Sequence, residues 1–364
     1  SRIGGDEFVA VLVDLEQPQD CEPVLTRLLH AAADPLQLDE HLLQVSASIG
    51  VTIYPSDGVE PDLLIRHADQ AMYQAKQAGK NRFHLFDVAH DIAVKTQREE
   101  TARIRQGLQD GEFVLHYQPK VNMRTGAVIG AEALIRWQHP ERGLLAPAAF
   151  LPSIENHPIC IDVGEWVIAT ALRQMADWKA QGLDVPVSVN IDAMQLQKEG
   201  FSQRLSQLLD QQPQVPARWL CLEILETNAL EDIALVSDIM RRCQALGVRF
   251  ALDDFGTGYS SLTYLKRLGA EEIKIDQSFV RDMLVDPDDL AIVQGVIGLA
   301  QAFHRDVVAE GVETVEHGAR LLPLGCHLAQ GYGIARPMPA QDLAQWAAQW
   351  EPHPTWTQQT EAAS

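Results

Sequence analysis

Two adjacent carboxylates, Asp253 and Asp254, end an apolar run that begins at Phe250, and a glycine-bearing loop follows them. Two acids at the tip of a buried strand cost free energy unless a cation or a proton compensates their charge. A pair of divalent metal ions compensates such a dyad and serves phosphoryl chemistry. A solvated loop in which one Asp caps the next helix is the alternative, and the rest of the chain favours the metal site.

The elements that would position this dyad alternate along the second part of the chain. Strand-like runs cover residues 127–135, 185–191, 220–225, 248–252, 272–275 and 306–309. Amphipathic helical stretches such as 164–179 and 235–246 separate them. Repeated βα units over roughly 240 residues predict an α/β fold, a (β/α)₈ TIM-like barrel.

Barrel enzymes place their chemistry at the carboxyl ends of the strands. The residues at these ends are Glu132, Asn190, Glu223, Asp253, Asp254, Lys274, Asp276, Glu310 and Gln330. Convergence of this many oxygen ligands predicts a hard cation, Mg²⁺ or Mn²⁺. The twelve histidines show no His-x-x-x-His or His-Glu-x-x-His spacing, which argues against zinc.

Two basic residues fit the same site. Lys274 lies between Ile273 and Ile275, so its side chain alternates away from theirs and faces the barrel mouth. A surface lysine at a sheet edge is the alternative, but a closed barrel has no such edge. Arg136 follows Glu132 closely, and it either grips a phosphate or forms a salt bridge with a barrel acid.

Composition restricts the partners. The formal net charge of −21 and the pI near 4.9 repel polyanions, so we expect no nucleic-acid polymer as partner. A phosphorylated substrate would then need local cations. The five cysteines are scattered without Cys-x-x-Cys spacing and indicate reduced thiols in a cytoplasmic chain. No signal peptide and no apolar run near the ~18 residues of a membrane span is present.

The chain divides into four predicted segments. Residues 1–87 form a partial α+β unit: a hairpin that turns at Gly4-Gly5, a helix over 21–33, a strand over 42–53 and a helix over 62–77. We expect a connecting helix over 88–110, the barrel over 111–350 and a flexible tail over 351–364. The first residues read as the interior of a domain, which leaves open that upstream segments anchor the parent protein to a membrane.

The motifs, taken in order, resemble the EAL-domain family of cyclic di-GMP phosphodiesterases over residues 98–345. They are Glu132-Ala133-Leu134, Ser188-Val189-Asn190, Leu222-Glu223, Asp253-Asp254-Phe255-Gly256-Thr257-Gly258-Tyr259, Lys274-Ile275-Asp276, Glu310-Gly311-Val312-Glu313 and Gln330-Gly331-Tyr332. The first unit resembles the C-terminal part of a GGDEF diguanylate cyclase domain. It carries Gly4-Gly5-Asp6-Glu7-Phe8, Ser48-Ile49-Gly50 and Ala68-Asp69-Gln70-Ala71-Met72-Tyr73.

The EAL resemblance implies two Mg²⁺ or Mn²⁺ ions and hydrolysis of cyclic di-GMP to linear pGpG. It assigns Glu132, Asn190, Glu223 and Asp253 to the first ion, and Asp253, Asp254 and Glu310 to the second. It further implies that Lys274 and Gln330 act on the attacking water or the phosphate oxygens. By the same resemblance Glu226 and Glu313 hold the loop 254–261, while Arg136 and Gln118 contact the dinucleotide. It also implies a homodimer.

Two positions depart from the family pattern. Leu225 stands where the family has Thr, and Asp192 stands where it has Ser. Leu225 weakens hydrogen bonding of the loop, but neither change removes a ligand, so we expect an active enzyme. A catalytically weak or inactive cyclic di-GMP receptor is one alternative. A bifunctional protein, whose GGDEF part regulates through GTP, is another; the region before Arg2 that would complete a cyclase site is absent from these residues.

Overall fold

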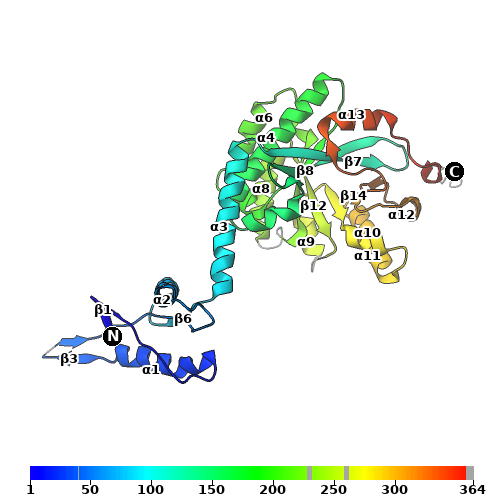
Figure 1. Ribbon diagram of the computed structural model, residues 1–364. Coiled ribbons are helices and arrows are strands. Elements are labelled where there is room, and N and C mark those ends of the chain that lie inside the picture. The colour runs from blue at the N-terminus through cyan, green and yellow to red at the C-terminus, as the bar shows by residue number, and fades with distance from the viewer. Residues whose placement is uncertain (40, 228–231, 258–261, 358–364) are drawn as a thin grey trace. The chain divides into compact units, whose positions relative to one another are not determined.

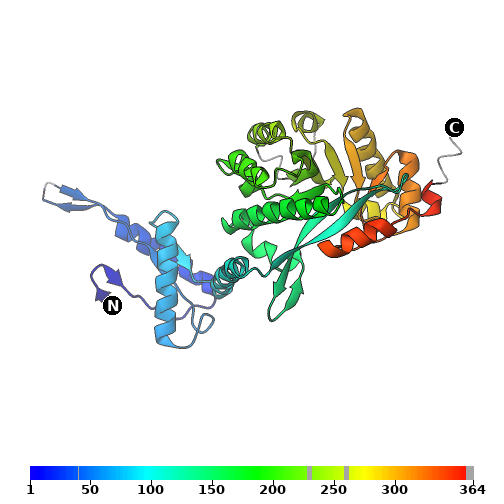
Figure 2. The ribbon, with the colours of Figure 1, turned by 90° about the horizontal axis from the view of Figure 1, so that it is seen from above.

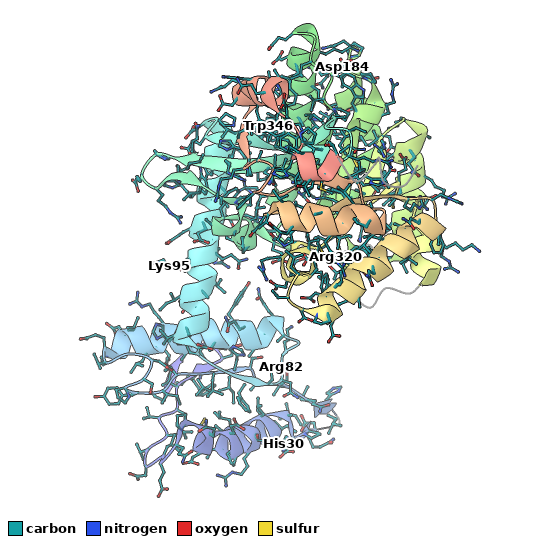
Figure 3. All side chains as sticks on the ribbon, turned by 90° about the vertical axis from the view of Figure 1, so that its right-hand side faces the viewer. His30, Arg82, Lys95, Asp184, Arg320 and Trp346 are labelled. Atoms are coloured by element: carbon teal, nitrogen blue, oxygen red, sulfur yellow. The ribbon has the colours of Figure 1, made fainter. Side chains whose placement is uncertain are left out.

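A computed structural model describes residues 1–39, 41–227, 232–257 and 262–357 (Figure 1). The chain forms two compact units, Ser1–Arg98 and Glu99–Ser364. Helix α3 (Val88–Gln109) contains the boundary between them, in the segment where the sequence predicts a connecting helix, and Lys95 lies on it (Figure 3).

The first unit is an α+β assembly of short strands and two helices. Its elements are β1 (Arg2–Gly4), β2 (Glu7–Phe8), α1 (Glu22–Ala33), β3 (Leu36–Leu38), β4 (His41–Leu43), β5 (Ile49–Val51), α2 (Pro61–Gln77) and β6 (Phe83–Leu85). Strands β1 and β2 form the predicted hairpin, and Gly5 takes a φ of 55° in its turn, a conformation that glycine adopts without steric cost.

One prediction for this unit is wrong. The single strand expected over residues 42–53 is two strands in different sheets: β4 pairs antiparallel with β3, and β5 pairs parallel with β6. A segment that serves two sheets must leave the first before it enters the second. Strand β5 packs closely on α2. The approach requires glycine at position 50, because a Cβ there would collide with the carbonyl oxygen of Ala68.

The second unit is an eight-stranded closed barrel surrounded by helices (Figures 1 and 2). Its strands close in the order β7 (Phe113–Asn122), β8 (Val128–His139), β10 (Val187–Asn190), β11 (Leu220–Leu225), β12 (Arg249–Phe255), β13 (Glu272–Ile275), β14 (Asp306–Ala309) and β15 (Leu328–Ala329). Six of the eight lie where the sequence predicts strands. The other two, β7 and β15, were not predicted.

Strand β7 makes the barrel differ from a uniform (β/α)₈ repeat, because it runs antiparallel to both β8 and β15. The physical reason is the short connection between β7 and β8. The Asn122 side chain accepts from the backbone N–H groups of Arg124 and Thr125, and Gly126 takes a φ of 75°. A connection this short cannot hold the crossover helix that parallel strands require.

The helices of the barrel unit cover the outside of the strands (Figure 2). They are α4 (Ile159–Ala180), α5 (Ala193–Gln197), α6 (Phe201–Asp210), α8 (Ile233–Ala245), α9 (Leu262–Arg267), α10 (Gln277–Asp282), α11 (Pro287–Ala302), α12 (Val315–Leu321), α13 (Ala340–Gln349) and α14 (Pro354–Thr357). Strands β9 (Gly143–Leu145) and β16 (Met338–Pro339) extend the sheet beyond the barrel. Among the described helices, none combines the length and apolar character that crossing a bilayer requires.

The C-terminal segment differs from the flexible tail predicted over residues 351–364. Helix α14 places Trp356 at 3% exposure, and its indole N–H donates to the carbonyl of Val315 at 2.9 Å. Trp346 (labelled in Figure 3) and Trp350 stack at 5.2 Å on the same side of the barrel. A buried indole with a satisfied donor anchors the chain as far as Thr357; residues 358–364 lie outside the described part.

Candidate metal centre

Neighbouring strands bring the predicted ligands together through their register. Asn190 on β10 lies opposite Glu223 on β11, and Leu225 on β11 lies opposite Asp253 on β12. Because the parallel strands end at the same rim, side chains distant in sequence converge there. The register thus accounts for the proximity of the carboxylates on the strands, whereas Glu310 follows the last residue of β14 and lies in a loop.

Two groups of carboxylates meet at this rim. Glu132, Glu223 and Asp253 each offer an oxygen within 4.8 Å of the others, and Asp253, Asp254 and Glu310 form a second such group. Asp253 belongs to both. All donors are carboxylate oxygens, which suit a hard divalent cation such as Mg²⁺ or Mn²⁺. The described residues therefore fit two neighbouring cations that share Asp253.

The Lys274 ammonium group lies at the centre of the cluster and is fully buried. Its Nζ atom is 2.6 Å from carboxylate oxygens of both Glu223 and Glu310, 3.0 Å from Asp253 and 3.4 Å from Glu132. One cation thus touches four acids, so the surplus charge of the cluster is negative. The prediction that Lys274 points into the barrel, rather than to an exposed edge, agrees with this position.

The electrostatics follow from burial among like charges. Burial, opposed by Lys274, raises the pKa of Glu132, Asp253 and Glu310 above their ordinary values. Burial also favours the neutral form of Glu223, yet the ammonium groups of Lys274 and Lys120 hold its pKa below the ordinary value. Such a site gains free energy from any further cation that binds the carboxylates.

Asp254 has an unusual backbone and an unusual pKa. Its φ of 52° lies in the left-handed region, which Asp tolerates better than most residues. Burial, followed by the neighbouring charge of Asp253, raises its pKa to about 7. Asp276, which caps α10 by accepting from the Ser278 N–H, also raises the pKa of Asp254.

Two amides orient the Glu132 carboxylate. Asn190 Nδ2 donates to Glu132 Oε1 at 2.7 Å, and Gln330 Nε2 donates to Glu132 Oε2 at 2.7 Å. Gln330 Nε2 also donates to Gln118 Oε1 at 3.0 Å, and Gln118 in turn donates to the Ala335 carbonyl. Because Asn190 uses its amino group on Glu132, its carbonyl oxygen is the atom that it offers as a ligand.

Glu226 fixes the first residue of the loop that follows β12. The Gly256 N–H donates to Glu226 Oε2 at 2.9 Å, and Glu226 is buried. Gly256 has a φ of 106°, which a side chain rarely permits. Glu313, predicted to hold the same loop, is exposed between β14 and α12. Residues 258–261 of the loop lie outside the described residues.

Arg136 is half-buried at the rim, and its guanidinium donates to the carbonyl of Ile135 at 2.9 Å. Within the described ranges, no barrel acid forms an ion pair with it, so the salt-bridge alternative is not what the structure has. Tyr332 is 54% exposed, and the Arg336 guanidinium lies 4.4 Å from the centre of its ring. The guanidinium of Arg136 thus keeps donors for an anionic ligand.

The two departures from the family pattern have local explanations. Asp192 is the N-cap of α5 and accepts from the Met194 N–H at 2.8 Å, a role that Ser would also fill. It also accepts from the Cys160 thiol at 3.4 Å. Leu225 is 38% exposed beside Asp253, so its apolar side chain is only partly removed from water.

Sequence reasoning missed three buried polar residues below the rim: Lys120 on β7, Ser188 on β10 and Glu272 on β13. Strand alternation was the signal that could have found them. Glu272 and Lys274 are two residues apart on β13, as are Gln118 and Lys120 on β7, and residues at i and i+2 share one face of a strand.

Comparisons with known proteins place the two units in named families. A family model described as EAL domain matches residues 101–337, and one described as diguanylate cyclase, GGDEF domain, matches residues 1–82. The chain is 40% identical to the bifunctional diguanylate cyclase/cyclic di-GMP phosphodiesterase MucR of Pseudomonas aeruginosa, covering 94% of this chain and 50% of that protein. It is 36% identical to the cyclic di-GMP phosphodiesterase PdeR of Escherichia coli, covering 95% and 52%.

A solved structure is similar in fold as well. The PaMucR phosphodiesterase in complex with c-di-GMP has a TM-score of 0.65 and 41% identity, and the match covers 67% of this chain and 99% of that one. The chain spans about half the length of the curated relatives it matches.

Proposed function

The chain belongs to the EAL-domain family, and from that premise we propose that it hydrolyses the cyclic dinucleotide cyclic di-GMP to linear pGpG. The observation that carries the proposal is the rim of the barrel, where two carboxylate groups share Asp253 around the Lys274 ammonium. A receptor that only binds the dinucleotide would have no need of such a concentration of buried acids.

We propose two divalent cations, Mg²⁺ or Mn²⁺, on grounds of charge. Six barrel carboxylates (Glu132, Glu223, Asp253, Asp254, Glu272 and Glu310) face two ammonium groups, Lys120 and Lys274. When all six are ionised, a surplus of four negative charges remains, which two divalent ions neutralise. Asp276 and Glu226 are outside this count because each accepts from a backbone N–H, of Ser278 and of Gly256 respectively.

The ligand sets follow from the two groups. Glu132, Asn190, Glu223 and Asp253 would hold the first ion, and Asp253, Asp254 and Glu310 the second. When bound, the ions would lower the pKa of a water molecule and neutralise charge that develops on phosphorus. All of these donors except Asn190 belong to the two carboxylate groups, and Asn190 contacts Glu132 directly.

The remaining residues orient the substrate and the water. Lys274 already reaches both carboxylate groups, so its ammonium is positioned to donate to the attacking water or to a phosphate oxygen. Gln330 and Gln118 form a chain of amides beside Glu132, and Gln330 would donate to the same phosphate by exchanging one of its two present acceptors, Gln118 or Glu132, for the substrate. Arg136, with donors directed to no acid of the described chain, would grip the phosphodiester from the rim.

The reaction balances as a hydrolysis. The water oxygen forms a bond to phosphorus in line with the bond to the 3′ oxygen, which breaks. One proton of the water ends on the departing 3′ oxygen, and the other ends in solvent or on the new phosphate monoester. The dinucleotide ring opens to linear pGpG. The predictions that residues 1–87 bind GTP and that the chain forms a homodimer remain predictions.

The test is incubation of the purified chain with cyclic di-GMP and Mg²⁺, with the products separated by chromatography beside an authentic pGpG standard. We expect pGpG to accumulate, EDTA to stop it, and added Mn²⁺ in excess over EDTA to restore it. Tight binding of cyclic di-GMP without any product, in the presence of either ion, would show a receptor and refute the proposed hydrolysis.

A further inference from the structure

A second cluster of buried charge lies directly below the rim of the barrel. Lys120 Nζ donates to Ser188 Oγ at 2.6 Å and lies 3.0 Å from Glu272 Oε1. It also lies 3.4 Å from Glu223 Oε1. These four side chains come from four different strands, β7, β10, β13 and β11, and each is at least nine-tenths buried. The cluster therefore crosses the barrel interior rather than lining one wall.

Glu223 connects this cluster to the carboxylates of the rim. Its Oε1 atom faces Lys120, and its Oε2 atom lies 2.6 Å from Lys274. A carboxylate flanked by an ammonium group on each oxygen cannot rotate about its last bond without losing one of them. Two charge-assisted contacts thus hold its plane.

The Lys120–Glu272 pair is costly as a purely structural device. Buried ion pairs repay their desolvation poorly, and apolar side chains of similar volume usually stabilise an interior as well or better. Lys120 is 4% exposed, so its long stem and its ammonium group are both removed from water. The pair has a stronger rationale if its charge acts on Glu223.

We propose that Lys120, held in place by Glu272 and Ser188, is a positioning residue that fixes the Glu223 carboxylate for divalent-cation binding. This inference rests on the metal site of the proposed function. Glu272 supplies the charge that keeps Lys120 from drawing Glu223 away from the rim. Partners of metal ligands of this kind typically change metal affinity by about 10- to 100-fold when they are removed.

The test is the double variant Lys120→Met with Glu272→Gln in the full chain. It removes one positive and one negative charge, so the net charge near the rim stays the same and a change in affinity reports positioning. Titration calorimetry with Mn²⁺ alone should give a dissociation constant about 10-fold higher than that of the unmodified chain. The Mn²⁺ concentration for half-maximal hydrolysis should rise in parallel, while kcat at saturating Mn²⁺ is retained.

A matched control removes a different ion pair of the barrel unit. Arg249, the first residue of β12, lies 2.7 Å from Glu271, which directly precedes β13, and neither residue forms an ion pair with Glu223. Arg249→Met with Glu271→Gln should leave Mn²⁺ affinity unchanged. If Lys120→Met with Glu272→Gln does not fold, Lys120→Gln with Glu272→Gln replaces it, because two facing amides can hydrogen-bond each other, and the same direction of change is expected.

The outcomes separate this inference from the proposed function. Mn²⁺ affinity equal in the double variant and the unmodified chain, whatever happens to the melting temperature, would overturn the positioning role. Failure of the unmodified chain to bind Mn²⁺ would instead refute the metal site itself, and with it both proposals.

Discussion

At the scale of single residues, Asp253 has the largest share in the site, because it belongs to both carboxylate groups and contacts Lys274. Asp253→Asn keeps the side-chain volume but removes the charge that both proposed ions would share. We expect hydrolysis to fall by at least about 100-fold, more than the loss of an outer partner costs. Chromatography of pGpG at saturating Mg²⁺ measures it.

The control for Asp253→Asn is the same change at the far end of the barrel. Asp306 is exposed at the start of β14, 3.4 Å from Arg249. Asp306→Asn should hydrolyse cyclic di-GMP at the rate of the unmodified chain. Full turnover in Asp253→Asn would show that this residue is not a shared ligand.

Leu225 carries the second prediction at this scale. Its side chain is 38% exposed in register with Asp253, so Leu225→Thr gives up little apolar burial and adds a hydroxyl next to the loop that starts at Gly256. We expect kcat to stay the same or rise. Steady-state kinetics with cyclic di-GMP measure it, and a large drop in kcat would mean that the apolar side chain supports the loop.

How well the site could be predicted also depends on particular residues. Glu132, Glu223, Asp253 and Lys274 lie on strands whose apolar runs are clear in the sequence, and the structure brings them together. Lys120 escaped because it follows Pro119, and a proline usually argues against a strand interior. From the sequence alone, a lysine on a strand is interpreted as a surface residue. Only the structure shows that Lys120 faces Glu272 inside the barrel.

At the scale of elements, the predicted repeat of βα units was right for six strands and wrong at the closure. Five of the six strands, β10 to β14, lie between helices, and β8 lies between β7 and β9; each of the six carries an apolar run that is visible in the sequence. Strand β7 carries polar residues on its inward face and joins β8 through a tight turn, and β15 has only two residues. Strand β7 has an apolar run of only three residues, at its start, and β15 is too short to show one, so pairing with the neighbouring strands determines both.

Helix α14 gives a prediction about stability. Trp356 is almost fully buried, and its ring lies against Gly318 of α12, where a Cβ would collide with the indole. Trp356→Ala should lower the free energy of unfolding of the barrel by about 3 kcal/mol, the usual cost of deleting a large buried aromatic side chain. Urea titration followed by circular dichroism measures the difference.

An exposed neighbour provides the comparison for Trp356→Ala. Thr355 lies on the same short helix with its side chain in solvent, so Thr355→Ala should leave the free energy of unfolding within about 0.5 kcal/mol. If Trp356→Ala lowers the free energy of unfolding by less than about 1 kcal/mol, α14 detaches readily in solution. The flexible tail predicted from the sequence would then be correct.

At the scale of the whole molecule, the chain and its site are both negatively charged, so both repel an anionic substrate. A net charge of −21 opposes the approach of a dinucleotide that carries two phosphates. Local cations must therefore make the potential at the rim positive. Among the described residues, Lys274 and Arg136 are basic side chains at the rim. Bound divalent ions would therefore serve substrate capture as well as the chemistry.

The two compact units lead to a prediction about unfolding. The first unit buries a small core around Leu25, Leu29 and Phe86 and leaves many large apolar side chains exposed, whereas the barrel has an extensive core. Calorimetry should show two transitions, of which only the barrel transition responds to Mn²⁺. At 100 times the dissociation constant, a single binding site stabilises by about 2.7 kcal/mol, which raises the midpoint by about 5–10 °C. Asp253→Asn should abolish that shift and leave the other transition in place, whereas one transition that moves as a whole would show that the two units unfold together.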